Sequence, residues 1–72
     1  MHVTYDPSAD AAYIALKHPV GPGEAVRQQN VVIRNAEVVL DFDNDDRLLG
    51  IEIIGAGAAL PAETLQAAQR PN

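Results

Sequence analysis

Residues 37–54 read EVVLDFDNDDRLLGIEII, and this stretch decides the fold. Two apolar runs flank the polar segment Asn44-Asp45-Asp46. Within each run, apolar side chains recur at every second position, which places them on one side of a β-strand. The stretch therefore predicts a hairpin whose strands span residues 37–43 and 48–54.

The apolar side chains also predict the register of this hairpin. We place Asp43 opposite Asp46, so that one face of the hairpin is continuously apolar. A slip of one residue would set the apolar side chains against the polar face, so the register is well specified. The expected cross-strand pairs are Leu40–Leu49 and Val38–Ile51.

The same alternation extends toward the N-terminus. A proline turn at residues 6–10 and a loop rich in proline and glycine at residues 18–23 interrupt it. The segment at residues 24–33 is rich in β-branched residues, and we expect a bulge near Asn30. The three further strands are predicted at residues 2–5, 11–17 and 24–33.

The C-terminal part predicts one short helix over residues 61–69. Pro61 suits the first helical position, and Leu65 and Ala68 form a sparse apolar stripe. So short a helix must dock on the sheet and covers only part of one face. The other face carries a few apolar side chains among polar ones: Tyr13, Val32, Val39 and Leu48. The predicted class is α+β, an antiparallel β-meander of four to five strands with one short C-terminal helix, forming a single domain over residues 1–72.

Size and composition favour self-association. A chain of 72 residues buries a small core, and the absence of cysteine excludes disulfides and thiolate chemistry. Additional buried area must then come from a second copy, so we expect a homodimer. The N-terminal residues carry no basic segment followed by a long apolar run, so we expect a cytoplasmic protein.

The charge narrows the range of partners. Five basic and ten acidic residues give a net charge of −5, and the basic residues are scattered. Nucleic-acid binding requires a basic patch, so we expect no nucleic-acid partner. No apolar run approaches the roughly 20 residues that span a bilayer, so we expect no membrane association. A basic protein partner suits the charge better.

Two segments resemble the YuzE-like family of small prokaryotic proteins of unknown function. Residues 5–14 read YDPSADAAYI and residues 41–53 read DFDNDDRLLGIEI. They are similar to the family's N-terminal hairpin motif and to its acidic turn followed by a Gly-Ile-Glu-Ile strand. Asp46 departs from the pattern, since the family usually has glycine there. The resemblance implies a β-meander with a C-terminal helix, brings no activity, and makes an antitoxin-like role conceivable.

The acidic turn provides the candidate metal ligands, namely Asp41, Asp43, Asp45 and Glu52. Their spacing matches positions 1, 3, 5 and 12 of a calcium loop of the EF-hand type. Two features oppose this interpretation: Asp46 stands where that loop needs glycine, and the flanking segments alternate as strands do. A solvated hairpin turn is therefore the favoured interpretation, with cation binding as the alternative.

Few side chains suggest catalysis. Asp6 and Asp10 flank the proline turn and more commonly stabilise such a turn than act as an acid–base pair. His2 and His18 come close if the first hairpin forms, but neither has an evident carboxylate partner. Ser8 lies in no nucleophile motif. An enzyme remains open only if Asp6, Asp10 and His2 of two chains meet at a dimer interface.

We therefore predict a small protein that is a non-enzymatic, homodimeric protein-interaction module without a cofactor. The alternatives are a cation-binding protein that uses the acidic turn and an enzyme with a site at the dimer interface. The exposed edge of the sheet and the half-apolar face would provide the affinity, and the acidic residues would steer a basic partner.

Overall fold

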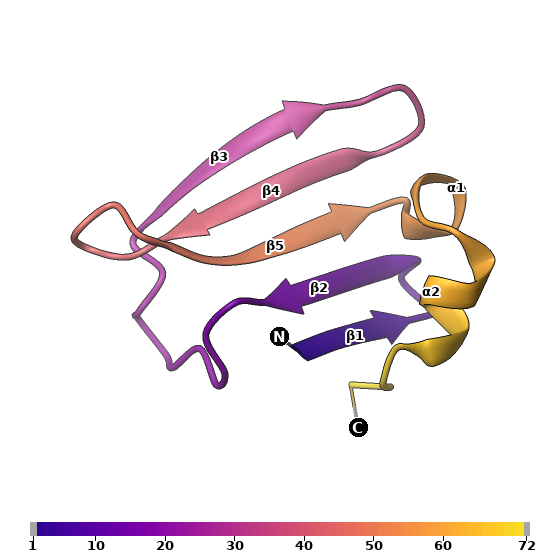
Figure 1. The fold of residues 1–72 in the computed structure, drawn as a ribbon. Helices are drawn as coiled ribbons and strands as arrows, with labels where there is room; N and C mark the ends of the chain where they lie inside the picture. The colour runs from indigo at the N-terminus through magenta and orange to yellow at the C-terminus, as the bar shows by residue number, and fades with distance from the viewer. Residues whose placement is uncertain (1, 72) are drawn as a thin grey trace.

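The computed structural model describes residues 2–71 as one five-stranded antiparallel sheet with two short helices, which confirms the α+β class (Figure 1). The strands lie close to the predicted segments, and the last one ends at the predicted residue. The elements are β1 (His2–Asp6), β2 (Ala11–Ala15), β3 (Arg27–Val32), β4 (Glu37–Phe42), β5 (Leu48–Ile54), α1 (Ala56–Ala59) and α2 (Ala62–Ala67).

The strand order is β1-β2-β5-β4-β3. Strands β3, β4 and β5 form a continuous meander, and the β1–β2 hairpin adds to the outer side of β5. The last strand in the sequence is therefore the central strand of the sheet. The loop between β2 and β3 carries the chain from one half of the sheet to the other edge (Figure 1).

The registers align side chains into rows that cross all five strands. One row consists of Tyr5, Ala12, Ile53, Val38 and Val31, and the next row on the same side consists of Val3, Ile14, Ile51, Leu40 and Gln29. We call this side the helix face, because both helices pack on it. The other side, the open face, carries a row of Thr4, Tyr13, Glu52, Val39 and Asn30 and a row of His2, Ala15, Gly50, Asp41 and Gln28.

Two short helices follow the sheet instead of the single helix predicted at residues 61–69; α2 lies within that range, and α1 precedes it. Gly55 adopts φ 86°, a left-handed conformation that suits glycine, and turns the chain directly into α1. Pro61 then precedes α2 as its N-cap rather than occupying the first helical position. Both helices lie at the end of the sheet where β1 and β5 finish (Figure 1).

The core lies beneath the helices at this end of the helix face. Ala12, Ile53 and Ala56 are its buried centre. Tyr5, Leu60 and Leu65 are among the partly buried side chains that pack around them. The row from Val3 to Gln29 extends beyond the helices, and its apolar members Ile14, Leu40 and Ile51 stay half-buried. The helices therefore cover only part of their face.

The predicted register of the β4–β5 hairpin is wrong by two positions in the partner strand. Leu40 pairs with Ile51, and Val38 pairs with Ile53. The faces stay the same because the error is an even number of residues. The predicted bulge near Asn30 is also not found; the irregularity lies in the β4–β5 ladder between Asp41 and Phe42.

The turn explains part of the difference. Its hydrogen bonds run from the Asp43 N–H to the Arg47 carbonyl at 2.9 Å and from the Asp46 N–H to the Asp43 carbonyl at 3.0 Å. Asp43 therefore faces Arg47, and Asp46 occupies the left-handed region with φ 60°. This is the geometry of a three-residue hairpin loop. The bulge beyond it adds the remaining displacement, since Asp41 pairs with Gly50 but Phe42 pairs with Leu48.

Candidate functional site

The proline turn between β1 and β2 holds Asp6 and Asp10, and each aspartate stabilises local structure. Asp6 Oδ1 accepts hydrogen bonds from the Ser8 hydroxyl at 2.7 Å and from the Ser8 N–H at 3.0 Å. These bonds, the hydroxyl's first, lower the pKa of the Asp6 carboxyl. Ser8 thereby stabilises the turn, and its hydroxyl donates to the carboxylate of Asp6.

Asp10 joins the first hairpin to the first helix. It takes φ 51°, and its carbonyl accepts the N–H groups of Gly55 and Ala56 at 2.9 and 3.0 Å. Its carboxylate accepts the Gly57 N–H at 2.8 Å and the Tyr5 hydroxyl at 2.8 Å. A side chain at residue 57 would crowd this carboxylate, because an added Cβ would lie 2.9 Å from Asp10 Oδ1. Asp10 is therefore a structural anchor for α1.

The open face holds a hydrogen-bonded group at the middle of the sheet. Asp41 is only 8% exposed, and its Oδ1 accepts the Gln28 side-chain amide at 2.9 Å. Its Oδ2 accepts the Tyr13 hydroxyl at 3.2 Å. To reach Asp41, the Tyr13 side chain crosses above Gly50, where an added Cβ would lie 2.1 Å from the hydroxyl oxygen. Three strands, β2, β4 and β3, thus contribute one side chain each.

This group is poorly suited to proton transfer at neutral pH. Burial, the charge of Asp41 and its hydrogen bond raise the pKa of Tyr13 to about 12. Tyr13 therefore keeps its proton and acts as a donor. The Asp41 carboxylate has both oxygens engaged by neighbours. The arrangement stabilises the sheet across β5.

The candidate metal ligands do not converge in the structure. Asp43 Oδ1 accepts the N–H groups of Asp45 and Arg47, and both Asp43 and Asp45 contact the Arg47 guanidinium. The backbone hydrogen bond from Arg47 is the main cause of the lowered pKa of Asp43. Asp41 points at Tyr13 instead of the turn. Among residues 2–71, no group of three or more acidic or histidine side chains is placed to hold a metal ion.

Glu52 completes this comparison. It faces Tyr13 on one side and Val39 on the other, in the row beside that of Asp41 on the open face. Its carboxylate adds to the rise in the Tyr13 pKa through its charge. Asp43 and Asp45 belong to the turn beyond the end of β4, so Glu52 is separated from them by the ladder.

His2 and His18 do come together. Their rings stack with centroids 4.1 Å apart and an angle of 18° between planes. Both side chains line a shallow hollow of about 300 Å³ on the open face. Within the described residues, both imidazoles lack a hydrogen-bonded carboxylate, and Asp6 and Asp10 are engaged elsewhere. The hollow is lined by His2, Thr4, Tyr13, Ala15, His18, Pro19, Val20 and Pro71.

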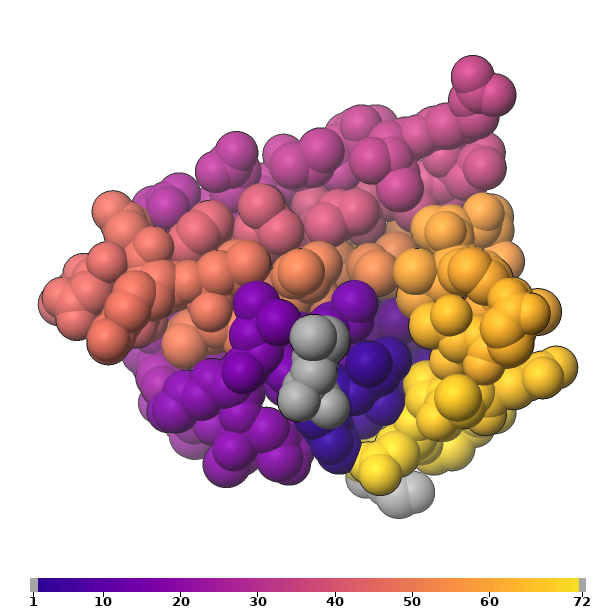
Figure 2. All heavy atoms as spheres, in the orientation of Figure 1, coloured from indigo at the N-terminus to yellow at the C-terminus, as the bar shows by residue number. Residues whose placement is uncertain are grey.

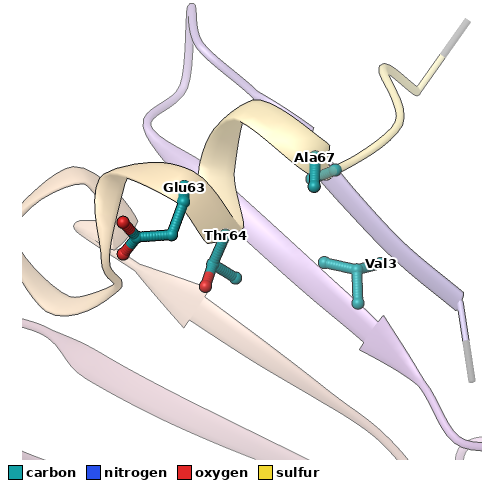
Figure 3. Close-up of a pocket in the computed structure, with 5 residues that line it drawn as sticks. Val3, Glu63, Thr64 and Ala67 are labelled. Atoms are coloured by element: carbon teal, nitrogen blue, oxygen red, sulfur yellow. The ribbon is translucent and has the colours of Figure 1, made fainter.

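A second hollow, of about 380 Å³, lies between α2 and β1 (Figure 3). Val3 faces the helix from the strand, and Thr64 and Ala67 face it from α2, while the carboxylate of Glu63 lies at the rim. The lining is mainly apolar and offers a single charged group. It is a continuation of the partly covered helix face and holds no reactive pair.

The two edges of the sheet differ. Beyond β1, the C-terminal segment runs alongside, and Gln69 exchanges hydrogen bonds with Val3 and Tyr5 at 3.0 and 2.8 Å. At the other edge, all six residues of β3 are exposed, and within residues 2–71 nothing pairs with its outer side. Figure 2 shows β3 along the upper rim of the molecule. Val32 is 82% exposed there.

Sequence reasoning recognised an exposed edge but did not locate it. The signal was available in Val31-Val32-Ile33, because three consecutive apolar residues of a strand cannot all face one side of a sheet. Val31 and Ile33 are 39% and 42% exposed. The contact between Tyr13 and Asp41 was also missed. Gly50, the single glycine of β5, was its signal, since glycine within a strand marks a close approach.

Comparison with known proteins identifies the family. Residues 2–56 match the family described as "Protein of unknown function (DUF2283)". No curated protein and no solved structure matches the chain significantly. Among the described residues, neither helix has the length and apolar character needed to cross a membrane.

Proposed function

We propose a function on the following premise: the chain belongs to the DUF2283 family, whose description assigns no activity, and its own surface supports a homodimeric protein-interaction module. The observation that carries the proposal is the exposed edge strand β3. An edge strand presents unpaired backbone N–H and C=O groups, which are a template for another strand. Pairing of this kind is a common mode of protein recognition.

Side-chain chemistry at β3 supports pairing over repulsion. Natural edge strands are commonly protected by lysines, prolines or a covering segment. β3 contains none of these; its one charged residue is Arg27, which packs over the Phe42 ring at 4.2 Å. Its end carries the exposed apolar side chains of Val31 and Val32. A strand paired along the outer edge of β3 would bury these side chains and would also satisfy the unpaired backbone groups.

The small core provides the second support. No large side chain among the described residues is fully buried, and part of the helix face remains uncovered. A second copy joined at β3 extends the sheet and adds the buried area that a chain of 72 residues lacks. Most reactive side chains are meanwhile engaged in structural hydrogen bonds, which supports a non-enzymatic role.

The proposal includes the YuzE-like resemblance and a cytoplasmic location. The module could also pair with a different protein, and we propose that such a partner is basic. An antitoxin-like role would be one example of such pairing with a different protein. The acidic turn at residues 43–46 lies next to the start of β3, where Arg27 contacts Asp46 at 3.1 Å. Its carboxylates would steer a basic chain toward the edge.

The oligomeric state tests the proposal. Sedimentation equilibrium at 5–200 μM (roughly the range in which weak pairs assemble) should give twice the chain mass of 7.7 kDa. Val32→Lys should raise the dissociation constant of the dimer about tenfold, because a lysine on the edge opposes pairing. Gln66→Lys, which adds the same charge on the exposed side of α2, should leave it unchanged.

A wild-type chain that stays monomeric throughout this range would remove the homodimer. A pull-down from native cells at moderate salt would then decide the heterologous form. Recovery of a basic protein whose binding Val32→Lys weakens would support pairing at β3, and recovery of the chain alone would contradict the interaction role.

A further inference from the structure

The backbone of β3 determines which residues can bond to a second copy. The Ile33 N–H donates to the Ala36 carbonyl at 3.0 Å, and the strand register continues this pairing. In an antiparallel ladder, hydrogen-bonded and non-hydrogen-bonded pairs alternate. Val31 therefore directs its backbone groups toward β4, while the backbone groups of Asn30 and Val32 point away from the sheet.

Two-fold symmetry restricts the pairing further. When a strand pairs with its own copy in antiparallel fashion, outward-directed residues must face outward-directed residues. Even-numbered residues therefore face even-numbered residues, and odd-numbered residues face odd-numbered ones. The symmetry axis then passes through a residue rather than between two residues. Three axes lie near the apolar end of this edge; they pass through Asn30, Val31 or Val32.

The side chains distinguish these axes. An axis through Asn30 sets Val31 against Gln29 and Val32 against Gln28, so apolar groups meet polar ones. An axis through Val32 matches apolar residues but engages only the end of the strand, because the chain turns away after Ile33. An axis through Val31 keeps the ladder over residues 29–33 and sets Val31 against its own copy. Val32 then faces Asn30 and Ile33 faces Gln29, so this axis is favoured because it combines one apolar pair with a ladder of five residues.

We infer that two copies pair through β3 in antiparallel fashion about a two-fold axis at Val31, an inference that rests on the proposed homodimer. Val31 is the last member of the helix-face row that begins at Tyr5 and passes through Ile53. The axis joins this row to the same row of the second copy. The two small cores then share one apolar row across a ten-stranded sheet. Asn30 bonds through its backbone to Val32 of the second copy.

Charge agrees with this arrangement. The five residues in the proposed ladder, 29–33, are uncharged. The nearest acidic group, Glu37, accepts a hydrogen bond from the Asn30 side chain at 2.6 Å and lies in the row of Val32 on the open face. No like charges are placed directly opposite each other, although each chain has a net charge of −5.

Single cysteines test the axis, because the chain contains no other cysteine. Under mild oxidation, Val31→Cys should form a disulfide with its own copy, since residues of a non-hydrogen-bonded pair have Cα atoms about 4.5 Å apart. Asn30→Cys alone and Val32→Cys alone should not, because each is offset from its copy by two positions, more than the roughly 7 Å that a disulfide bridges. A mixture of these two variants should cross-link.

Asp45→Cys at the exposed β4–β5 turn is the matched control for collision between molecules. We expect Val31→Cys to cross-link at least about tenfold faster than Asp45→Cys at micromolar protein, because pairing raises the effective thiol concentration toward millimolar. Far-UV circular dichroism checks that each reduced variant keeps its sheet.

The outcomes separate the two proposals. Self-cross-linking of Asn30→Cys or Val32→Cys in place of Val31→Cys would overturn the axis but keep a dimer at β3. No cross-linking above the control in a chain that sediments as a dimer would overturn the pairing at β3. A chain that sediments as a monomer would overturn the homodimer itself.

Discussion

Each face of the sheet carries a tyrosine that donates to an aspartate, and the two pairs differ in what they stabilise. On the helix face, Tyr5 and Asp10 close the rim of an apolar core and fasten the first hairpin to α1. On the open face, Tyr13 and Asp41 bridge β2 and β4 above Gly50, where no helix lies. The comparison indicates that the helices bury the apolar centre of one face, whereas on the other face a hydrogen-bonded group lies beside the buried side chains of Ala15 and Val39.

The largest effect should come from a pair of neighbouring residues on β5 that face opposite sides. Ile53 is 6% exposed beneath the helices, and Ile54 is 43% exposed on the open face. Ile53→Ala should lower the free energy of unfolding by about 2–5 kcal/mol, and Ile54→Ala should lower it by less than about 1 kcal/mol. Urea denaturation measures both. Similar losses would show that the helix face does not contain the main core.

A methyl group on the open face should have the next largest effect. Gly50→Ala places a Cβ where the Tyr13 ring now lies, and we expect a loss of about 1–3 kcal/mol as the ring is displaced from Asp41. In a Tyr13→Ala background the same substitution should be nearly neutral. A double-mutant cycle by urea denaturation measures the coupling. Additive effects would show that Gly50 is required for another reason.

Alkaline pH should distinguish the two tyrosines. The pKa of Tyr13 is about 12 in the folded protein against 10.0 for a free side chain, so folding favours its protonated form. This contribution is complete below pH 10 and is lost as the pH rises toward 12. Tyr13→Phe should cost about 1 kcal/mol at pH 7.

Tyr13→Phe should also remove much of the decline in stability between pH 10 and 12. Thermal unfolding at pH 9 and 11.5 measures this decline. Tyr5→Phe is the comparison on the helix face, where the hydrogen bond to Asp10 is the main cause of a smaller rise in the Tyr5 pKa, so this variant should remove less of the decline. A decline that stays as steep in Tyr13→Phe as in the wild type would contradict the bridge.

The smallest effect should lie in the β4–β5 turn, outside both faces. Asp46 has φ 60°, a conformation that glycine adopts without strain. Asp46→Gly relieves this strain but adds backbone freedom and removes an exposed ion pair with Arg27. We expect the relief of strain to offset the other two contributions within about 0.5 kcal/mol. Urea denaturation is the measurement, and a loss above about 1 kcal/mol would show that the ion pair matters.

The sequence predicted the faces of the strands better than their alignment. Apolar alternation reports which side chains share a side, so Val38, Leu40, Ile51 and Ile53 were placed together correctly. Alternation does not report the conformation of Asp46 or the extra residue in β5 opposite the end of β4. These two local features displace the register by an even number and leave the apolar pattern unchanged.

The side-chain contacts of the open face could not be predicted because they depend on strand order. Tyr13 meets Asp41 only because β5 lies between β2 and β4. Adjacent positions in the sequence do predict the turn contacts, and Asp6, Ser8 and Asp43 behave as local turn chemistry suggests. The spacing of the acidic residues matched a calcium loop by number but not by backbone geometry.

The central position of β5 has a consequence for synthesis on the ribosome. The first 47 residues contain the β1–β2 hairpin and the β3–β4 hairpin but not β5, the strand that joins them. Isolated two-stranded ribbons are marginal in water. A nascent chain therefore stays uncommitted until residues 48–54 leave the exit tunnel and β5 can join the two hairpins.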